Sequence, residues 1–191
     1  IYLRPSSSLY SYANKFIECA SHAIGGVIYM MPASSAFISH SNFINTLSSV
    51  TGGVFYINEA SLILLNSLII NSTSDQGGVL YSDSGMFNFT NVTSENTIAN
   101  LKGGFCYVIF TSCFIANSSI TRSMSYHDGG VIIADHPFFF NIFNTVIEEC
   151  KVLEVGGVYI IGLPNIDVVF ERFTCSLNTA MNSACVYMRE G

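Results

Sequence analysis

Charged residues are scarce in this 191-residue chain, where they make up 10% of the sequence, compared with roughly 25% in soluble domains. Only 7 residues are basic and 13 are acidic, which leaves a net charge of −6. Nucleic-acid binding needs clustered Lys and Arg to neutralise phosphates, so we expect no nucleic-acid partner. The low charge does not indicate disorder, because disordered chains are poor in aromatic residues and this one has 15 Phe and 10 Tyr.

Long hydrophobic runs are also missing, although 50% of the residues are hydrophobic. The most apolar stretch, 131–143, is interrupted by Asp135, His136, Pro137 and Asn141. It is too short to cross a bilayer, so we expect no transmembrane segment in this chain. The sequence starts at Ile1 without an initiator Met or a recognisable signal peptide, and we expect it to be a fragment of a longer repeat array.

A glycine doublet followed by apolar residues recurs along the whole chain. Its six copies are Gly25-Gly26, Gly52-Gly53, Gly77-Gly78, Gly103-Gly104, Gly129-Gly130 and Gly156-Gly157. A degenerate seventh copy starts at Ser183, and the successive copies are 27, 25, 26, 26, 27 and 27 residues apart. This narrow spread indicates one structural repeat.

Each repeat is rich in residues that form strands. Val, Ile, Phe and Tyr follow the doublets. Two further short apolar stretches follow in most repeats, as at 61–64 and 67–70, with Asn, Ser and Thr between them. We therefore predict an all-β fold: a single-stranded parallel β-helix with three short strands per coil and six to seven coils, formed by residues 1–191 as one segment. Leucine-rich, helical and propeller repeats fit the composition and the spacing less well.

We assign a structural role to all the doublet glycines. At one corner of every coil the chain must bend sharply, and stacked corners leave no room for a side chain. A phosphate-binding role would instead need a single glycine-rich loop that leads into a helix.

The repeat resembles the right-handed parallel β-helix repeats of the pectin-lyase-like superfamily. More narrowly, it is similar to the Gly-Gly-Ala/Val repeats of chlamydial polymorphic outer-membrane proteins and of related surface proteins in ciliates and other protists. The six doublets carry this resemblance, and Phe114-Ile115-Ala116-Asn117 matches the companion Phe-x-x-Asn motif. The resemblance implies a right-handed coil and a role as a cell-surface adhesin or scaffold.

Carboxylates and histidines show no convergent pattern. Enzymes of the β-helix class stack Asp residues on neighbouring coils. Here the Asp residues lie two coils apart or at different coil positions, and the histidines have unrelated offsets: Asp75, Asp83, Asp128, Asp135, Asp167, His22, His40, His127 and His136. We expect no catalytic, cofactor-binding or metal-binding residues; a pectin-lyase-like lyase or hydrolase is the third interpretation.

Cysteines and glycosylation sequons point to a location outside the cell. Cys150 and Cys175 lie near the third strand of adjacent coils, which makes them a candidate disulfide. Four sequons are candidate N-glycosylation sites: Asn71, Asn88, Asn91 and Asn117. Six cysteines, these sequons and few charges favour an extracellular or cell-surface location.

Tyrosines recur at one position of the repeat: Tyr29, Tyr56, Tyr81, Tyr107 and Tyr187. Side chains alternate between the faces of a strand, and we place Phe55, Leu80, Ile132 and Tyr159 on the opposite face. Both faces are then apolar, which suggests a fully buried strand and therefore a covering partner.

Together these patterns suggest a structural scaffold module of an extracellular or cell-surface protein that assembles end to end and laterally into filaments or surface layers. Its expected partners are other copies of itself or neighbouring repeat proteins. An adhesin or carbohydrate-binding β-helix, with glycans as partners, is the alternative. The fold alone does not decide between them.

Overall fold

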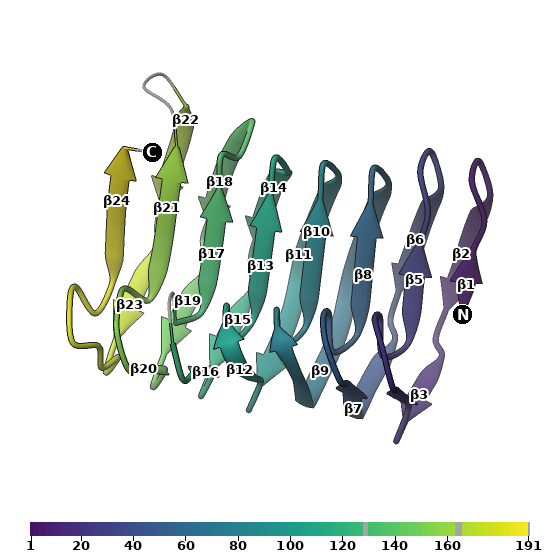
Figure 1. Cartoon of the computed structure of the whole chain (residues 1–191), viewed down its shortest axis with the longest axis horizontal. Helices are drawn as coiled ribbons and strands as arrows, with labels where there is room; N and C mark the ends of the chain where they lie inside the picture. Colours follow the sequence, from purple (N-terminus) through teal and green to yellow (C-terminus); the bar gives the residue numbers. More distant parts are fainter. Residues whose placement is uncertain (128–129, 163–165, 191) are drawn as a thin grey trace.

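The chain forms an all-β parallel solenoid of about seven turns in this computed structural model (Figure 1). The structure describes residues 1–127, 130–162 and 166–190. The repeat spacing is roughly 26 residues, as predicted, and the predicted parallel β-helix is confirmed. Within the described ranges there is no helix long and apolar enough to cross a membrane.

The first side of the solenoid is an eight-stranded parallel sheet in which every strand comes from a different coil. From β5 onward, each of its strands follows a glycine doublet or the degenerate copy at Ser183. They are β1 (Tyr2–Leu3), β5 (Ile28–Met30), β8 (Phe55–Asn58), β10 (Leu80–Asp83), β13 (Cys106–Ile109), β17 (Ile132–Asp135), β21 (Val158–Gly162) and β24 (Val186–Glu190).

A sixteen-stranded sheet forms the other three sides. The second side contains β2 (Ser8–Tyr12), β6 (Ser35–Ser39), β14 (Ser112–Ala116), β18 (Phe139–Phe143), β22 (Asp167–Glu171) and the starts of β9 (Ser61–Gln76) and β11 (Met86–Glu95). The third contains β3 (Lys15–Ile17), β15 (Ser119–Thr121), β19 (Val146–Glu148), β23 (Thr174–Ser176), the start of β7 (Asn42–Ser48), the middle of β9 and the end of β11. The fourth contains β4 (Ala20–Ser21), β12 (Ile98–Lys102), β16 (Met124–Ser125), β20 (Lys151–Val152) and the ends of β7 and β9.

Each complete coil therefore has four sides, and the prediction of three strands per coil is wrong by one short strand. The sequence hides the extra side because some strands turn corners without a break. β9, for example, runs along three sides and bends only at Asn66 and Asn71.

Four corners separate the sides, and every residue with positive φ in the described chain lies at one of them. The first corner has Ser6, Ala33, Glu59, Ser84, Phe110 and His136; the second has Ala13, His40, Asn66, Asn91, Asn117, Asn144 and Arg172. The third has Glu18, Asn45, Asn71, Asn96, Arg122, Glu149 and Leu177; the fourth has Gly25, Gly52, Gly77, Gly103, Gly156 and Ser183.

The glycine doublets stack on one another at the fourth corner. The Gly26 amide donates to the Gly52 carbonyl at 3.0 Å, and the Gly53 amide donates to the Gly77 carbonyl at 3.1 Å. A Cβ atom on Gly53 would overlap the carbonyl oxygen of Gly78 in the next coil. The corner thus excludes side chains, as the sequence suggested; Gly129 lies outside the described residues.

The interior of the solenoid is filled by apolar side chains from all sides. Among the largest are Phe43, Phe87 and Phe89, which have no exposed surface. The first-side residues Phe55 and Leu80 also point inward and are fully buried. They were placed on the opposite face from the tyrosines, and the structure assigns that face to the core.

The sixth doublet is displaced by one residue relative to the others. Val158 pairs with Ile132, and Tyr159 pairs with Ile133. Counting from the doublet had placed Tyr159 with the inward residues. The structure corrects this assignment, because β21 begins two residues after Gly156, whereas β17 and the earlier strands of this side begin three residues after the first glycine of their doublet.

Candidate functional site: the outer surface of the coils

A column of tyrosines runs along the outside of the first side. The pairing register places one residue of each coil in it: Tyr2, Tyr29, Tyr56, Tyr81, Tyr107, Ile133, Tyr159 and Tyr187. We call this set the tyrosine column. It contains the five tyrosines that the sequence grouped together and adds Tyr2 and Tyr159.

The rings at the first coils of the tyrosine column are stacked face to face. Ring centroids are 5.1 Å apart for Tyr2 and Tyr29, 4.9 Å for Tyr29 and Tyr56, and 5.4 Å for Tyr56 and Tyr81. The interplanar angles of these pairs are 12°, 14° and 7°. Because each ring covers the face of its neighbour, the column presents ring edges and hydroxyl groups outward.

The part of the tyrosine column from Tyr107 to Tyr159 is more deeply packed. Tyr107, Ile133 and Tyr159 are 9%, 2% and 7% exposed, although they point away from the core. The ammonium group of Lys102 lies 5.6 Å from the centroid of the Tyr107 ring, in a cation–π contact. The pKa of Tyr81 is raised to about 12. Burial is the largest cause, and smaller electrostatic effects come from Tyr107, Tyr56 and Asp83. The hydroxyl group of Tyr81 is therefore neutral at physiological pH.

Asparagine side chains form two further columns, at the second and third corners. The Asn71 amide donates to Asn45 Oδ1 at 3.0 Å, and the Asn91 amide donates to Asn66 Oδ1 at 2.7 Å. Asn144 donates to Asn117 Oδ1 at 2.8 Å. Asn tolerates positive φ better than most residues, so one side chain both permits the bend and bonds to the adjacent coil.

A buried hydroxyl residue follows many of these corner residues. Ser67, Ser118 and Thr145 point inward, and each hydroxyl group donates to the carbonyl two residues earlier at 2.7–2.8 Å. After the third corner, the Thr46 hydroxyl group donates to the Ser72 hydroxyl oxygen of the next coil at 2.9 Å. Sequence reasoning missed these positions. The Asn-Ser and Asn-Thr dipeptides at 45, 66, 71, 96, 117 and 144 are the signal that could have located them.

The four sequons lie on the outer surface. Asn71, Asn91 and Asn117 are exposed corner residues of the asparagine columns, and Asn88 is a half-buried residue in the middle of the second side. Corner asparagine followed by an inward residue and an outward Thr or Ser generates a sequon for structural reasons. The corner geometry thus explains the sequons at Asn71, Asn91 and Asn117 but not the one at Asn88, and the glycosylation of all four stays a prediction.

The carboxylates and histidines are spread over the surface. Asp75 accepts a hydrogen bond from Asn100 at 2.8 Å, and His136 Nδ1 lies 2.6 Å from Asp135 Oδ1. His127 Nδ1 is 3.9 Å from Glu154 Oε1, while Asp128 lies outside the described residues. No group of three or more His, Cys, Asp or Glu side chains among the described residues is arranged to hold a metal ion.

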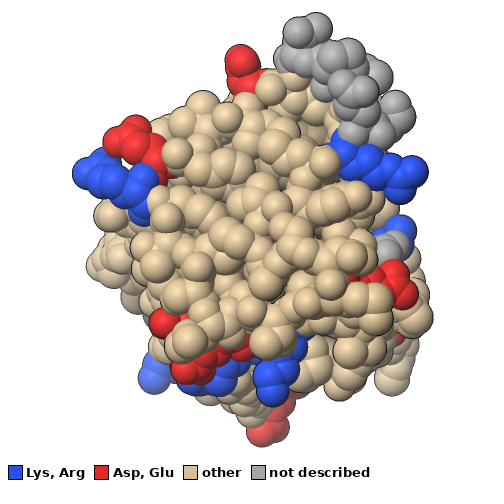
Figure 2. Space-filling model, turned by 90° about the vertical axis from the view of Figure 1, so that its left-hand side faces the viewer, with Lys and Arg blue, Asp and Glu red and all other residues tan. Residues whose placement is uncertain are grey.

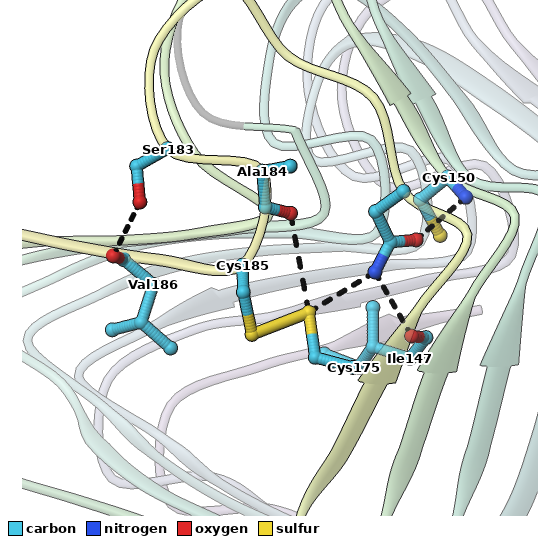
Figure 3. The surroundings of a disulfide bond; sticks show 8 residues. Ile147, Cys150, Cys175, Ser183, Ala184, Cys185 and Val186 are labelled. Atoms are coloured by element: carbon cyan, nitrogen blue, oxygen red, sulfur yellow. Dashed lines mark hydrogen bonds between the residues drawn. A yellow bond between two sulfur atoms is a disulfide. The ribbon is translucent and has the colours of Figure 1, made fainter.

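The disulfide joins Cys175 to Cys185, so the prediction of a Cys150–Cys175 bridge is wrong (Figure 3). The register explains the difference: Cys175 pairs with Ile147, and Cys150 lies three residues further along its coil. Cys185 reaches Cys175 across the last coil with a Cα–Cα distance of 5.9 Å. Burial raises the pKa of the free Cys150 thiol to about 11.

Arg122 connects three coils at the third corner. Its guanidinium forms an ion pair with Glu95 in the preceding coil and lies 3.5 Å from Glu149 in the following coil. Its Nε also donates to Asn96 Oδ1 at 3.0 Å. Arg122 therefore continues the asparagine column as a partly exposed charged member rather than forming an open anion site.

Comparison of the chain with protein-family models, with curated proteins and with solved structures found no match in any of the three.

Proposed function

We propose that this chain is a structural scaffold module, a rod segment of an extracellular or cell-surface protein that assembles with copies of itself or with neighbouring repeat proteins. One observation carries the proposal: the outer aromatic and amide groups are used to join coil to coil. The tyrosine column and the asparagine columns run parallel to the axis of the rod. Such columns add stiffness along the axis.

The C-terminal end of the solenoid, at the left of Figure 1, supports axial contacts in this proposal. Figure 2 shows that Lys, Arg, Asp and Glu side chains lie around the periphery of this end, whereas its centre is uncharged. Val168, Phe170 and Phe173 are only partly buried there and pack against the core. A further coil of the same kind, from the same or another polypeptide, would cover these side chains and pair with the exposed strand edges.

The proposed location is supported by the Cys175–Cys185 disulfide and by the exposed sequons. The resemblance to pectin-lyase-like surface repeats is consistent with the same location. A carbohydrate-binding role receives less support, because sugar rings stack on open aromatic faces and the faces of Tyr29 and Tyr56 are covered by their neighbours.

The proposal is tested by following self-association over a concentration series. Sedimentation velocity and electron microscopy of the purified protein should show assemblies of aligned rods that grow with concentration. A protein that stays monomeric up to about 100 µM, above the micromolar range of weak assembly contacts, would contradict the proposal. Binding to a glycan array by such a monomer would favour the carbohydrate-binding alternative.

A further inference from the structure

The second side of the solenoid has an outer face that is nearly free of charge. Three residues of each of its seven strands point outward, and the central ones form a row in register: Tyr10, Phe37, Ile63, Asn88, Phe114, Asn141 and Val169. We call this surface the second-side face. Its charged residues are Asp167 and Glu171, both on β22, and Glu171 Oε1 lies 3.5 Å from a guanidinium nitrogen of Arg172 at the adjoining corner.

Large apolar side chains are exposed on the second-side face. Tyr10 is 82% exposed, Met86 is 42% exposed and Val169 is 41% exposed. A groove of about 170 Å³ lies between Tyr10, Phe37 and Ile63. Contiguous exposed apolar surface of this kind marks a site of protein association.

Charge distinguishes this face from the first and third sides of the rod. The third side and its corners carry Glu95, Glu148 and Glu149, and the first side carries Asp83 and Asp135. In a chain with a net charge of −6, contact between two copies through those sides would bring carboxylates together. The second-side face avoids this repulsion over six of its seven strands.

We propose that the second-side face binds the same face of a second copy, with the two rods antiparallel. This inference rests on the proposed scaffold function and identifies the surface through which two rods would associate side by side. A two-fold axis along the middle strand, β11, brings the first coil of one copy over the last coil of the other. Tyr12 then lies opposite Glu171, and Ser8 lies opposite Asp167. Both carboxylates thereby face hydroxyl donors.

Parallel rods are disfavoured by the same residues. A two-fold axis along the rod would place Asp167 of one copy opposite Glu171 of the other, twice per dimer. Like charges directly opposite one another across a sheet contact are destabilising. The antiparallel arrangement removes both repulsions and keeps Asn88 at the centre of the contact, which requires that the sequon at Asn88, unlike the three corner sequons, carries no glycan.

The size of the face is sufficient for a weak dimer. Five residues per strand and seven strands give a footprint of roughly 17 by 34 Å, or about 1,100 Å² for two copies. That total exceeds the roughly 1,000 Å² expected of a biological interface but is below the standard size. We therefore expect a reversible dimer rather than an obligate one.

The test compares two lysine substitutions on the same strand. Asn88→Lys places like charges at the two-fold axis, whereas the matched control Thr93→Lys lies outward on the third side. Sedimentation equilibrium should show at least about a tenfold weaker dimer for Asn88→Lys and an unchanged dimer for Thr93→Lys, since only Asn88→Lys places two like charges opposite each other at the axis. Circular dichroism confirms that both variants fold, and Asn88→Asp provides a second repulsive variant.

Cysteine cross-linking tests the orientation in a Cys19→Ser background. Asn88→Cys should form a disulfide-linked dimer under mild oxidation, and Tyr10→Cys should not, because Tyr10 lies opposite Val169 of the other copy. Efficient cross-linking of Tyr10→Cys would overturn the antiparallel arrangement. Association that survives Asn88→Lys would contradict the second-side face as the dimer contact but would leave the scaffold function standing. A wild-type monomer that binds a glycan through this face would contradict both the dimer contact and the scaffold function.

Discussion

Individual residues hold this solenoid together at its corners, where the backbone adopts positive φ. The fourth corner uses glycine because neighbouring coils approach too closely for a side chain, while the second and third corners use Asn for both bend and hydrogen bond. The corners therefore differ in what they tolerate, and substitutions at them should have different consequences.

Gly53→Ala should destabilise the protein strongly, because its Cβ atom would overlap the Gly78 carbonyl oxygen in the rigid backbone of the next coil. We expect a loss of about 3 kcal/mol in the free energy of unfolding, measured by urea denaturation. Gly157→Ala is the matched control: its Cβ would meet backbone oxygen atoms at 2.8 and 2.9 Å in the last coil, and its loss should be smaller. Equal losses would argue against close stacking at this corner.

Asn71 allows the backbone and hydrogen-bond contributions of an asparagine corner to be separated. Asn71→Gly keeps the positive φ of +55° and removes the bond to Asn45, which should cost about 1 kcal/mol. Asn71→Ala loses the same bond and also strains the backbone by roughly 1–2 kcal/mol more. Chemical denaturation should rank Ala below Gly in stability, and the reverse order would contradict the role given to this corner.

At the scale of the element, the strands are linked by side chains stacked outside the core as well as inside it. The tyrosine column is the clearest example. Burial raises the pKa of Tyr81 to about 12, so its neutral form is favoured in the folded state. The stability from this preference is fully present below pH 10, the ordinary tyrosine pKa, and is lost as pH rises through 12.

Alkaline titration should therefore show a tyrosine that ionises last and together with unfolding. Tyrosinate absorbance and circular dichroism of the wild type should report a common transition above the ordinary tyrosine pKa. Tyr81→Phe should remove one late-ionising group and extend the stability of the fold to higher pH. If every tyrosine ionised near its ordinary pKa while the protein stayed folded, the packing of the column would be wrong.

The Cys175–Cys185 disulfide adds a covalent link to the hydrogen bonds of the coil that contains it. Closing the 10-residue separation between Cys175 and Cys185 should contribute about 3 kcal/mol, which Cys185→Ser would remove. Thiol titration in denaturant without reductant should find the four free cysteines of the structure. Cys150→Ser should lower that count to three; a count of five would restore the Cys150–Cys175 bridge, because Cys175 and Cys185 would then both be free.

The sequence predicted the coil but only one of its four corners. The glycine doublets are a uniform marker with a constant spacing, whereas the first corner contains residues as different as Ala33, Glu59 and Phe110. Those positions are selected by geometry rather than by residue type, so no motif marks them. The Asn-Ser and Asn-Thr dipeptides could have indicated two further corners.

The inward and outward faces of the first side were not predictable from periodicity. Phe55 and Tyr56 are both apolar enough for a core, and alternation alone cannot assign either of them to the outside. The structure assigns Tyr56 to the outside, where ring stacking with Tyr29 and Tyr81 covers it. The covering partner expected from the sequence is therefore not required for this strand.

At the scale of the whole molecule, the solenoid is a rod whose length grows by one strand spacing per coil. Its surface combines corners that bond along the axis with a second-side face that is nearly free of charge and that we propose for lateral contact. The scaffold function and the antiparallel dimer both depend on this regular stack. A direct test of the stack therefore carries more weight than any single substitution.

Pulsed electron paramagnetic resonance on spin-labelled cysteine pairs provides that test. Lys15, Thr93, Ser119, Val146 and Thr174 occupy one outward row of the third side. With one label at position 15 and the second moved along this row, we expect distances that increase by about 4.8 Å per coil. Distances that fail to increase in equal steps, or that decrease along the series, would contradict the continuous solenoid.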